Sequence, residues 1–193
     1  LTDASRVARH HVSVPLVVRA AQPQDADGIA RVHVAAWQAG YRGLLPDAFL
    51  SGVSVEQRTS RWQAILAQPA DPPAQTLVAE RDGTVVGFAS VGPARDEDAG
   101  PTTGELWAIY VHPDHWGTGA GHALHERAVQ VLRDAGPDDA TLWVLAGNER
   151  AAAFYARHGW APDGATKTDW RDDVRLDEVR YRVRLGGEAG PQP

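Results

Sequence analysis

The segment at residues 104–121, GELWAIYVHPDHWGTGAG, constrains the fold more than any other part of the chain. Residues 106–111 form an apolar run that is rich in aromatic and β-branched side chains, and Pro113 follows it closely. Such a run predicts a buried strand with a defined end. Three glycines then occur at alternate positions, namely Gly117, Gly119 and Gly121. The pattern therefore predicts a strand, a short connection and a glycine-rich turn.

The glycine-rich turn opens a helix, because apolar residues recur at helical spacing from Thr118 onward, at Leu124, Ala128, Val131 and Leu132. The first N–H groups of a helix have no partner within it, and the peptide dipoles place positive charge there. Glycines let an anion approach this backbone closely. The turn therefore predicts a phosphate site, and a flexible turn without a ligand is the alternative.

Two familiar phosphate motifs do not fit this turn. A Walker-type loop would place Lys and then Ser or Thr after its last glycine, whereas His122 and Ala123 follow Gly121. A dinucleotide fingerprint has the spacing GxGxxG directly behind the strand, whereas the present spacing is GxGxG after an intervening segment at residues 112–115. Nucleotide hydrolysis and dinucleotide binding are therefore not favoured.

A second strand and helix follow this helix. Residues 141–145 are apolar, and residues 148–160 read NERAAAFYARHGW. The two motifs together resemble the GNAT superfamily of N-acetyltransferases, in which a Q/R-x-x-G-x-G/A loop binds the pyrophosphate of coenzyme A and an N-x-x-A-x-x-F-Y-x-x-x-G-F segment follows. Gly119 and Gly121 match the small positions of that loop, while Trp116 stands where the family has Gln or Arg.

The resemblance covers residues 16–185 and implies an α/β (α+β) GNAT fold. We expect a mixed central sheet of about seven strands flanked by about four helices, in the order β-α-α-β-β-β-α-β-α-β-β. The residues before and after this single domain, 1–15 and 186–193, are predicted to be an extension and a tail. The strands are expected at 16–20, 76–81, 85–91, 106–111, 141–145, 160–168 and 178–185, and the helices at 25–38, 55–68, 118–135 and 148–158.

Two connections are expected to be irregular. Residues 92–104 are polar, acidic and rich in glycine, which is typical of a mobile loop. Residues 169–177 are acidic and are expected to join the last two strands as a loop. In the family, the strands at 106–111 and 141–145 run parallel but splay apart, and coenzyme A lies in the opening.

The composition of the chain excludes several classes of function. The chain of 193 residues has no cysteine, which excludes a cysteinyl acyl-enzyme, so acyl transfer would proceed by direct attack or use another nucleophile. Its formal net charge of -6 argues against nucleic acid and mildly favours a cationic acceptor such as an amine. No apolar run approaches the roughly 18 residues of a membrane span, and no signal-peptide core is found at the start. A cytoplasmic protein is expected, and Leu1 is not taken as its native start.

The resemblance assigns coenzyme-binding residues. It implies acetyl-CoA as the co-substrate, with the pyrophosphate cradled by Trp116, Gly117, Thr118, Gly119, Ala120 and Gly121 and with His122 near a phosphate. The backbone N–H groups of Ile109, Tyr110 and Val111 would hold the pantetheine and the thioester oxygen. Asn148 would touch the coenzyme, and its alternative role is the N-cap of the last helix.

The transfer of an acetyl group to an amine also requires a base, because an alkylamine with a pKa near ~10.4 is protonated at neutral pH. Glu105, at the start of the central strand, is the expected base, and it takes the proton directly or through water. Tyr155 resembles the tyrosine that gives a proton to the departing thiolate. The structural alternatives are a solvated glutamate and a core aromatic residue.

The acceptor is expected to contact Trp37, Tyr41 and Arg42, which lie in the region that forms one wall of the family's acceptor pocket. A helix end with Trp37 in the core is the alternative. Trp107 shares a face with Glu105 on a two-residue period, so it lines the acceptor site or belongs to the core. The acceptor itself is left open between a small-molecule amine and a protein amine, and a homodimer is possible because dimers are common in the superfamily.

Four histidines form two HxxH pairs, at His112 and His115 and at His122 and His125. The chain has no HExxH pattern and no cysteine, so no metal is expected, and His115 or His122 near a phosphate is favoured. The sequence thus predicts an acetyl-CoA-dependent N-acetyltransferase that works in a ternary complex. A non-catalytic acyl-CoA-binding or sensing module with the same fold is the alternative, and a different acyl donor is a third possibility.

Overall fold

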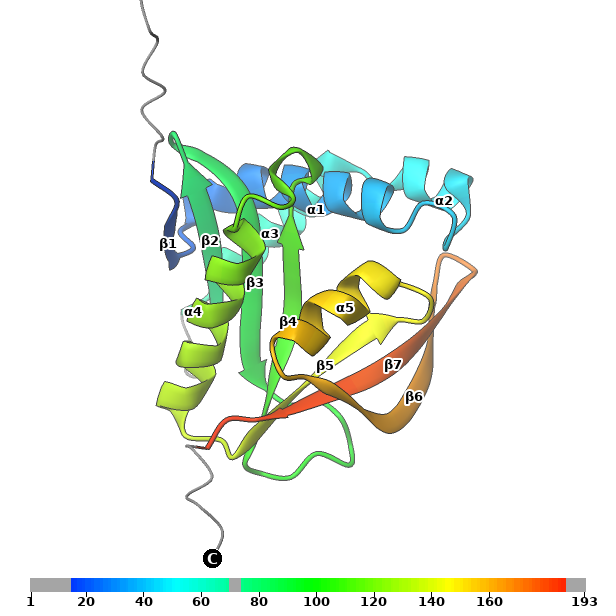
Figure 1. Cartoon of the computed structure of the whole chain (residues 1–193). Coiled ribbons are helices and arrows are strands. Elements are labelled where there is room, and N and C mark those ends of the chain that lie inside the picture. The colour runs from blue at the N-terminus through cyan, green and yellow to red at the C-terminus, as the bar shows by residue number, and fades with distance from the viewer. Residues whose placement is uncertain (1–14, 70–73, 187–193) are drawn as a thin grey trace, which may run out of the picture.

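The computed structural model describes residues 15–69 and 74–186 and contains one seven-stranded sheet in the order β1-β2-β3-β4-β5-β7-β6 (Figure 1). All neighbouring strands are antiparallel except β4 and β5. The expected extension and tail lie almost wholly outside the described residues. The strands are β1 (Val17–Ala20), β2 (Gln75–Arg81), β3 (Thr84–Pro93), β4 (Thr103–Val111), β5 (Asp139–Leu145), β6 (Ala161–Arg171) and β7 (Val174–Arg184). The expectation of a mixed sheet of about seven strands is confirmed.

Five α-helices flank the sheet, where about four were expected: α1 (Ala26–Gly40), α2 (Asp47–Gly52), α3 (Val55–Leu66), α4 (Ala120–Ala135) and α5 (Glu149–Arg157). Two 3-10 turns, η1 (Pro23–Asp25) and η2 (Pro113–His115), precede α1 and α4. The missed helix, α2, has six residues and buries only Leu50. A helix this short leaves no helical period in the sequence.

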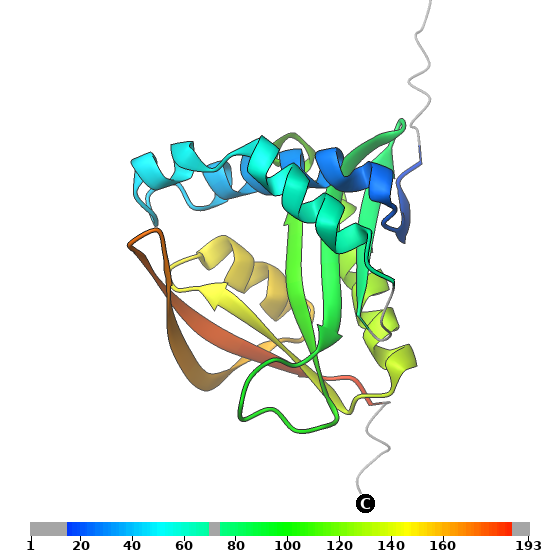
Figure 2. The ribbon, with the colours of Figure 1, turned by 180° about the vertical axis from the view of Figure 1, so that it is seen from behind.

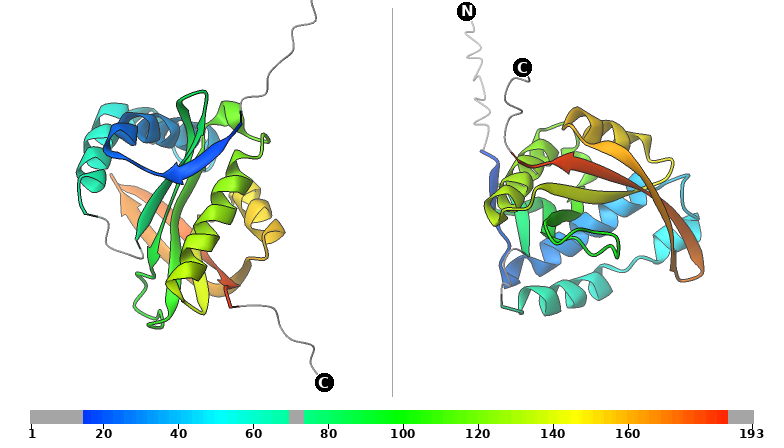
Figure 3. Two further views of the ribbon diagram at one scale, coloured as in Figure 1. Left: turned by 90° about the vertical axis from the view of Figure 1, so that its left-hand side faces the viewer. Right: turned by 90° about the horizontal axis from the view of Figure 1, so that it is seen from below.

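Two hydrophobic layers cover the two faces of the sheet. Helices α1 and α3 lie on one side and α4 lies on the other (Figure 3). Strand β2 serves both layers, because Leu77 and Ala79 pack in the core under α4 while Val78 packs in the core under α1. The side chains of a strand alternate between faces, so the apolar centre of β2, residues 77–79, must be covered on both sides.

Strands β4 and β5 pair over only three positions, Thr103↔Asp139, Gly104↔Ala140 and Glu105↔Thr141. Strand β5 pairs with β7 along its whole length instead. The β5-facing edge of β4 therefore has no strand partner beyond Glu105. This is the splay that the family resemblance implied, and the back view shows both strands (Figure 2).

A β-bulge interrupts β4 next to this splay. Ser90 of β3 pairs with Ala108 while the next residue, Val91, pairs with Leu106, so Trp107 is the extra residue. As a result Leu106 packs under α4, while Ala108 packs against the core under α1. The bulge shifts the alternation of side chains at this point, which a strict two-residue period does not foresee.

The connection between β3 and β4 was expected to be mobile, but the structure ties it to the sheet. Nη1 of Arg180 in β7 lies 3.2 Å from Asp96 Oδ2 and 2.7 Å from Asp98 Oδ1. The indole Nε1 of Trp143 also donates to Asp96. These contacts join residues far apart in sequence, which explains why local composition did not indicate them.

The segment at residues 169–177 was expected to be a loop, but most of it is strand. Strands β6 and β7 continue through it as a hairpin, and only Asp172 and Asp173 form the turn. Both residues have positive φ, 48° and 63°. Aspartate tolerates this region better than most residues, so the acidic composition marks a tight turn and not a long loop.

Candidate active site

The opening between β4 and β5 contains a cavity of about 940 Å³. Its wall is formed by the end of α1, the strands β4 and β5, the start of α4, and α5. Because its lining includes Val111 and Val144 from the α4 face and Tyr110 from the α1 face, the cavity passes through the sheet. The other lining residues include Ala36, Gly40, Tyr41, Trp107, Ile109, His115, Trp116, Gly117, Gly119, Gly121, His122, Asn148, Arg150, Phe154, Tyr155, Arg157 and His158.

The glycine-rich turn lies at one end of the cavity and leads directly into α4. Gly117 and Gly119 line the cavity with φ of 73° and 87°, a region that only glycine adopts readily. The first N–H groups of α4 lack helical partners here, so they are available to an anion at this end of the cavity. Thr118 donates to the carbonyl of His115, and Ala120 is buried. Neither of these two side chains lines the cavity.

Trp116 and Arg150 form a stacked pair in the cavity wall. The indole Nε1 of Trp116 donates to the carbonyl oxygen of Val111 at 2.8 Å. The guanidinium carbon of Arg150 lies 3.2 Å from the centroid of the Trp116 ring. Burial lowers the pKa of Arg150 from its ordinary value, and no described residue forms a hydrogen bond or ion pair with its side chain. The sequence prediction missed Arg150, although it stands two positions after Asn148 in the second motif.

The cavity is cationic in a chain that is acidic overall. Its lining contains Arg150, Arg157 and three histidines, His115, His122 and His158, and no Asp or Glu. The whole chain has a formal net charge of -6. Backbone N–H groups, guanidinium groups and imidazoles therefore converge on one end of the cavity, where they fit the diphosphate of a coenzyme.

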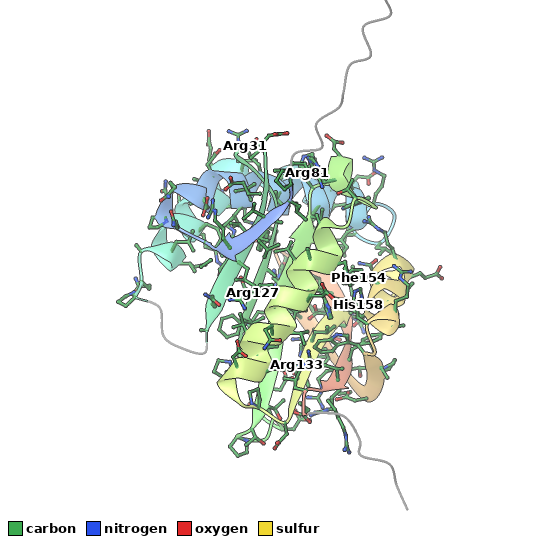
Figure 4. All side chains as sticks on the ribbon, turned by 60° about the vertical axis from the view of Figure 1, so that its left-hand side comes forward. Arg31, Arg81, Arg127, Arg133, Phe154 and His158 are labelled. Carbon is green, nitrogen blue, oxygen red and sulfur yellow. The ribbon has the colours of Figure 1, made fainter. Side chains whose placement is uncertain are left out.

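Three histidines pack between α4 and α5, beside Phe154 (Figure 4). His122 Nδ1 and His158 Nε2 lie 2.9 Å apart. His125 Nε2 accepts a hydrogen bond from Trp160 Nε1 at 2.8 Å, and burial together with its two histidine neighbours lowers the pKa of His125 to about 4. His125 is thus a neutral core residue, while His122 and His158 border the cavity. Within residues 15–69 and 74–186 no group of three or more His, Cys, Asp or Glu side chains could hold a metal ion.

The free edge of β4 presents backbone groups to the cavity. The N–H of His112 donates to Val86 of β3, whereas the carbonyl of Val111 points the other way and accepts from Trp116. Backbone groups alternate between the two edges of a strand, so those of Ile109 and Val111 face the cavity. Those of Tyr110 face β3, and Tyr110 lines the cavity with its side chain instead.

Two predicted coenzyme residues from α5 also reach the cavity. Asn148 is the N-cap of α5, because its Oδ1 accepts from the N–H of Ala151 at 3.1 Å, and it lines the cavity as well. Tyr155 lines the cavity with 9% of its surface exposed. Burial raises the pKa of the Tyr155 phenol, so it keeps its proton at neutral pH.

Glu105 lies outside the cavity lining and is 2% exposed. Arg95 binds both carboxylate oxygens of Glu105. Glu105 Oε1 is 2.6 Å from Arg95 Nη2, and Oε2 accepts from the backbone N–H of Arg95 at 2.9 Å and from its Nε at 3.2 Å. The guanidinium of Arg95 also lies over the Trp107 ring. The carboxylate therefore reaches an acceptor only through water or after Arg95 moves.

The four predicted acceptor residues divide into two pairs. Tyr41 and Trp107 line the cavity, and the hydroxyl of Tyr41 lies 3.2 Å from that of Tyr110. Trp37 is 4% exposed and packs in the core against Tyr41, and Arg42 is exposed at the surface. Trp143 also lines the cavity and was missed, because an apolar strand pattern alone does not tell which side chains meet an opening.

Comparison with known proteins finds relatives of this chain. A sequence model of the Acetyltransferase (GNAT) family matches residues 37–160. The chain is 29% identical over 165 residues to an uncharacterized N-acetyltransferase, YuaI, of Bacillus subtilis, which covers 85% of this chain and 90% of that protein. It is 31% identical over 141 residues to an uncharacterized N-acetyltransferase of Mycobacterium tuberculosis, which covers 72% of this chain and 85% of that protein.

The solved structures agree at the level of fold. An acetyltransferase structure from Salmonella typhimurium that contains its cofactor acetyl-CoA superimposes with a TM-score of 0.65 at 23% identity. The superposition covers 92% of this chain and 98% of that one. Among the described residues no helix is long and apolar enough to cross a membrane.

Proposed function

Because the chain belongs to the acetyltransferase (GNAT) family and is an acyltransferase, we propose that it transfers an acetyl group from acetyl-CoA to a primary amine. The amine attacks the thioester directly while both substrates are bound. The cavity that passes through the sheet carries this proposal, since it lets two substrates enter from opposite faces and meet at β4. The chain has no cysteine, which supports direct attack without a cysteinyl acyl-enzyme.

The coenzyme is proposed to bind at the cationic end of the cavity. The N–H groups at the start of α4, shaped by Gly117 and Gly119, receive the diphosphate, with His122 close by. On the same side Arg150 adds a guanidinium that has no carboxylate partner among residues 15–69 and 74–186. The pantetheine then follows the free edge of β4, where the backbone groups of Ile109 and Val111 point into the cavity.

The chemistry requires three functions at the thioester carbon. The amine nitrogen forms a bond to this carbon, the oxyanion receives hydrogen bonds, and the C–S bond then breaks to release the thiolate of coenzyme A. We assign the hydrogen bonds to the backbone N–H groups of Ile109 and Val111 on the free edge of β4. Tyr155 donates a proton to the departing thiolate, which its location in the cavity wall and its retained proton support.

Glu105 remains the proposed base and takes the proton of the amine through water or after Arg95 turns aside. Because Arg95 binds the carboxylate of Glu105, this residue acts as the base only through a bridging water or after Arg95 has moved. The acceptor approaches from the α1 side of the sheet, along Tyr41, Trp107 and Trp143. Both a small-molecule amine and a protein amine fit this proposal.

Calorimetric titration with acetyl-CoA, with ATP and NAD as control ligands, tests the proposal. We expect saturable binding of acetyl-CoA alone, followed by release of free thiol when an acceptor amine is added. Folded protein that does not bind acetyl-CoA would remove the proposed donor. Binding without transfer to any primary amine would instead favour an acyl-CoA-binding module.

A further inference from the structure

Three arginines gather around Trp37 and His33 on the α1 side of the sheet. Arg58 and Arg61 come from α3, and Arg171 is the last residue of β6. The guanidinium carbons of Arg58 and Arg171 lie 5.2 Å and 5.6 Å from the ring centroid of the same residue, Trp37. We call Arg58, Arg61 and Arg171 the arginine cluster. It is built from two segments that are more than a hundred positions apart in the sequence.

Arg58 is the partly buried member of this cluster, whereas Arg61 and Arg171 are exposed and Arg171 lies 3.3 Å from Asp169. Its side chain is partly buried and forms no hydrogen bond or ion pair with any described residue. Burial, followed by repulsion from Arg61 and Arg171, lowers the pKa of Arg58 from its ordinary value. Other arginines of similar burial, such as Arg19 and Arg182, bind carboxylates at 2.7 Å. Like charges that are held together in this way favour the binding of an anion.

Two buried polar atoms beside the cluster also lack partners among the described residues. They are the indole Nε1 of Trp37 and Nδ1 of His33. Trp37 is 4% exposed, so its N–H is a buried donor that has no acceptor. Burial and the three cationic neighbours lower the pKa of His33 to about 3, which keeps this imidazole neutral. The guanidinium groups of the cluster therefore lie beside the indole N–H of Trp37, a neutral donor that has no acceptor among the described residues.

Aromatic rings separate the cluster from the cavity. The His33 ring stacks on Tyr110 with centroids 5.1 Å apart, and the Trp37 ring meets the edge of Tyr41 at 5.2 Å. Tyr110 and Tyr41 both line the cavity. The cluster thus lies on the α1 side of the sheet, from which the acceptor is proposed to approach, whereas α4 lies on the opposite side (Figure 3). An anion at the cluster would therefore not belong to the coenzyme diphosphate.

From this geometry we propose that the acceptor is a small amine that carries a carboxylate, which Arg58 binds together with Arg61 and Arg171. The amine then reaches the thioester past Tyr41 and Tyr110. The intervening rings favour an acceptor whose carboxylate and amine are separated by several bonds, as in an ω-amino acid. This inference rests on the proposed N-acetyltransferase function and names the substrate class of the same site.

The test compares matched acceptors that differ only in charge. A series of ω-amino acids of increasing length and the corresponding ω-amino carboxamides are assayed with acetyl-CoA, and kcat/KM is measured for each. We expect a preference of roughly tenfold or more for the carboxylates, the effect of one hydrogen-bonded charge pair. Arg58→Gln should bring the ratio of carboxylate to carboxamide close to one. Arg127→Gln, which alters an exposed arginine on α4, should leave the ratio as in the wild type (Figure 4).

Equal kcat/KM for both series, or a preference that survives Arg58→Gln, would overturn the inference. Should no acceptor in either series be acetylated, calorimetry of both series on the coenzyme A complex replaces kinetics, and equal affinities reject the cluster. Acetyl-CoA binding by the wild type and by Arg58→Gln is measured first. A failure of the wild type to bind acetyl-CoA counts against the proposed function, whereas intact binding with no carboxylate preference counts against the arginine cluster alone.

Discussion

Single residues decide how the two ends of the cavity differ. At the coenzyme end, Arg150 stacks on Trp116 and has no carboxylate partner among the described residues. The GNAT motif places Gln or Arg where this chain has Trp116, so the guanidinium comes here from α5 and not from the loop itself. A flat indole supports a flat guanidinium through stacking and cation–π attraction.

The exchange Arg150→Ala should weaken the binding of acetyl-CoA. Loss of a hydrogen bond to a charged group costs about 1.5–3 kcal/mol, which corresponds to roughly a 10- to 100-fold rise in Kd by calorimetry. Acetylpantetheine lacks the diphosphate, so its kcat/KM should be equal in the variant and the wild type. A Kd for acetyl-CoA that stays within about twofold of the wild type would remove Arg150 from the phosphate site.

Glu105 and Arg95 provide a paired test of the proposed base. Glu105→Gln should lower kcat by roughly 10²-fold or more, the contribution of a positioned base. Arg95→Gln should retain turnover, because it leaves the buried carboxylate free to accept a proton. Both values come from steady-state kinetics, with urea unfolding as the measure of stability. Equal losses of stability with unchanged kcat in both variants would show that Glu105 only holds the β3–β4 connection.

At the scale of elements, the connection between β3 and β4 depends on one arginine. Arg180 of β7 is 5% exposed and binds Asp96, Asp98 and Asp163, so it joins this connection to the far half of the sheet. Its neighbouring carboxylates raise the pKa of Arg180 further above its ordinary value, and the guanidinium remains charged. The connection is therefore held by charge pairing at its middle and by Arg95 near its start.

Arg180→Gln should destabilise the fold strongly. Removing Arg180 takes the cation from Asp96 and leaves Asp163 with Arg182 alone. Breaking a buried ion network in this way costs roughly 3–5 kcal/mol in the free energy of unfolding. Urea denaturation measures this change. Arg31→Gln, which breaks an exposed pair with Asp27 one turn away on α1, is the matched control and should change the unfolding midpoint little. Similar midpoints for the two variants would contradict the proposed role of Arg180.

At the scale of the whole molecule, stability should fall in mild acid because two histidines are buried in the neutral state. The pKa of His125 is about 4 and that of His33 is about 3, both below the ordinary value of 6.5. The unfolded chain therefore binds protons first as the pH falls. The stability from each neutral imidazole is complete above about pH 6.5 and is lost as the pH approaches the lower pKa of the folded state.

The variant His125→Gln isolates this effect. We expect wild-type stability to drop between pH 6.5 and pH 4 by up to roughly 2–3 kcal/mol more than that of the variant. Glutamine still offers an acceptor to the indole N–H of Trp160 but does not titrate in this range. Free energies of unfolding from urea titrations at several pH values give the comparison. Parallel pH profiles of the two proteins would show that His125 does not contribute.

The parts of the fold that the sequence predicts are those marked by patterns of neighbouring residues. The strand at 106–111, the glycines after it and the Asn148 cap are local patterns, and all of them appear in the structure at or near their expected positions. Helix α2 and the bulge at Trp107 leave no such pattern. One is too short for a period, and the other adds a single residue to an otherwise regular strand.

Apart from helix α2, the sequence by itself determined the order of elements, the glycine-rich turn before α4 and the family, because hydrophobic period and backbone conformation depend on neighbouring residues. Only the tertiary structure decided which charges meet. It placed Arg150 on Trp116, bound Arg95 to Glu105, and gathered Arg58 and Arg171 around Trp37. Such contacts join side chains from segments that are distant in the chain, and their energies depend on burial and distance, which no local pattern encodes.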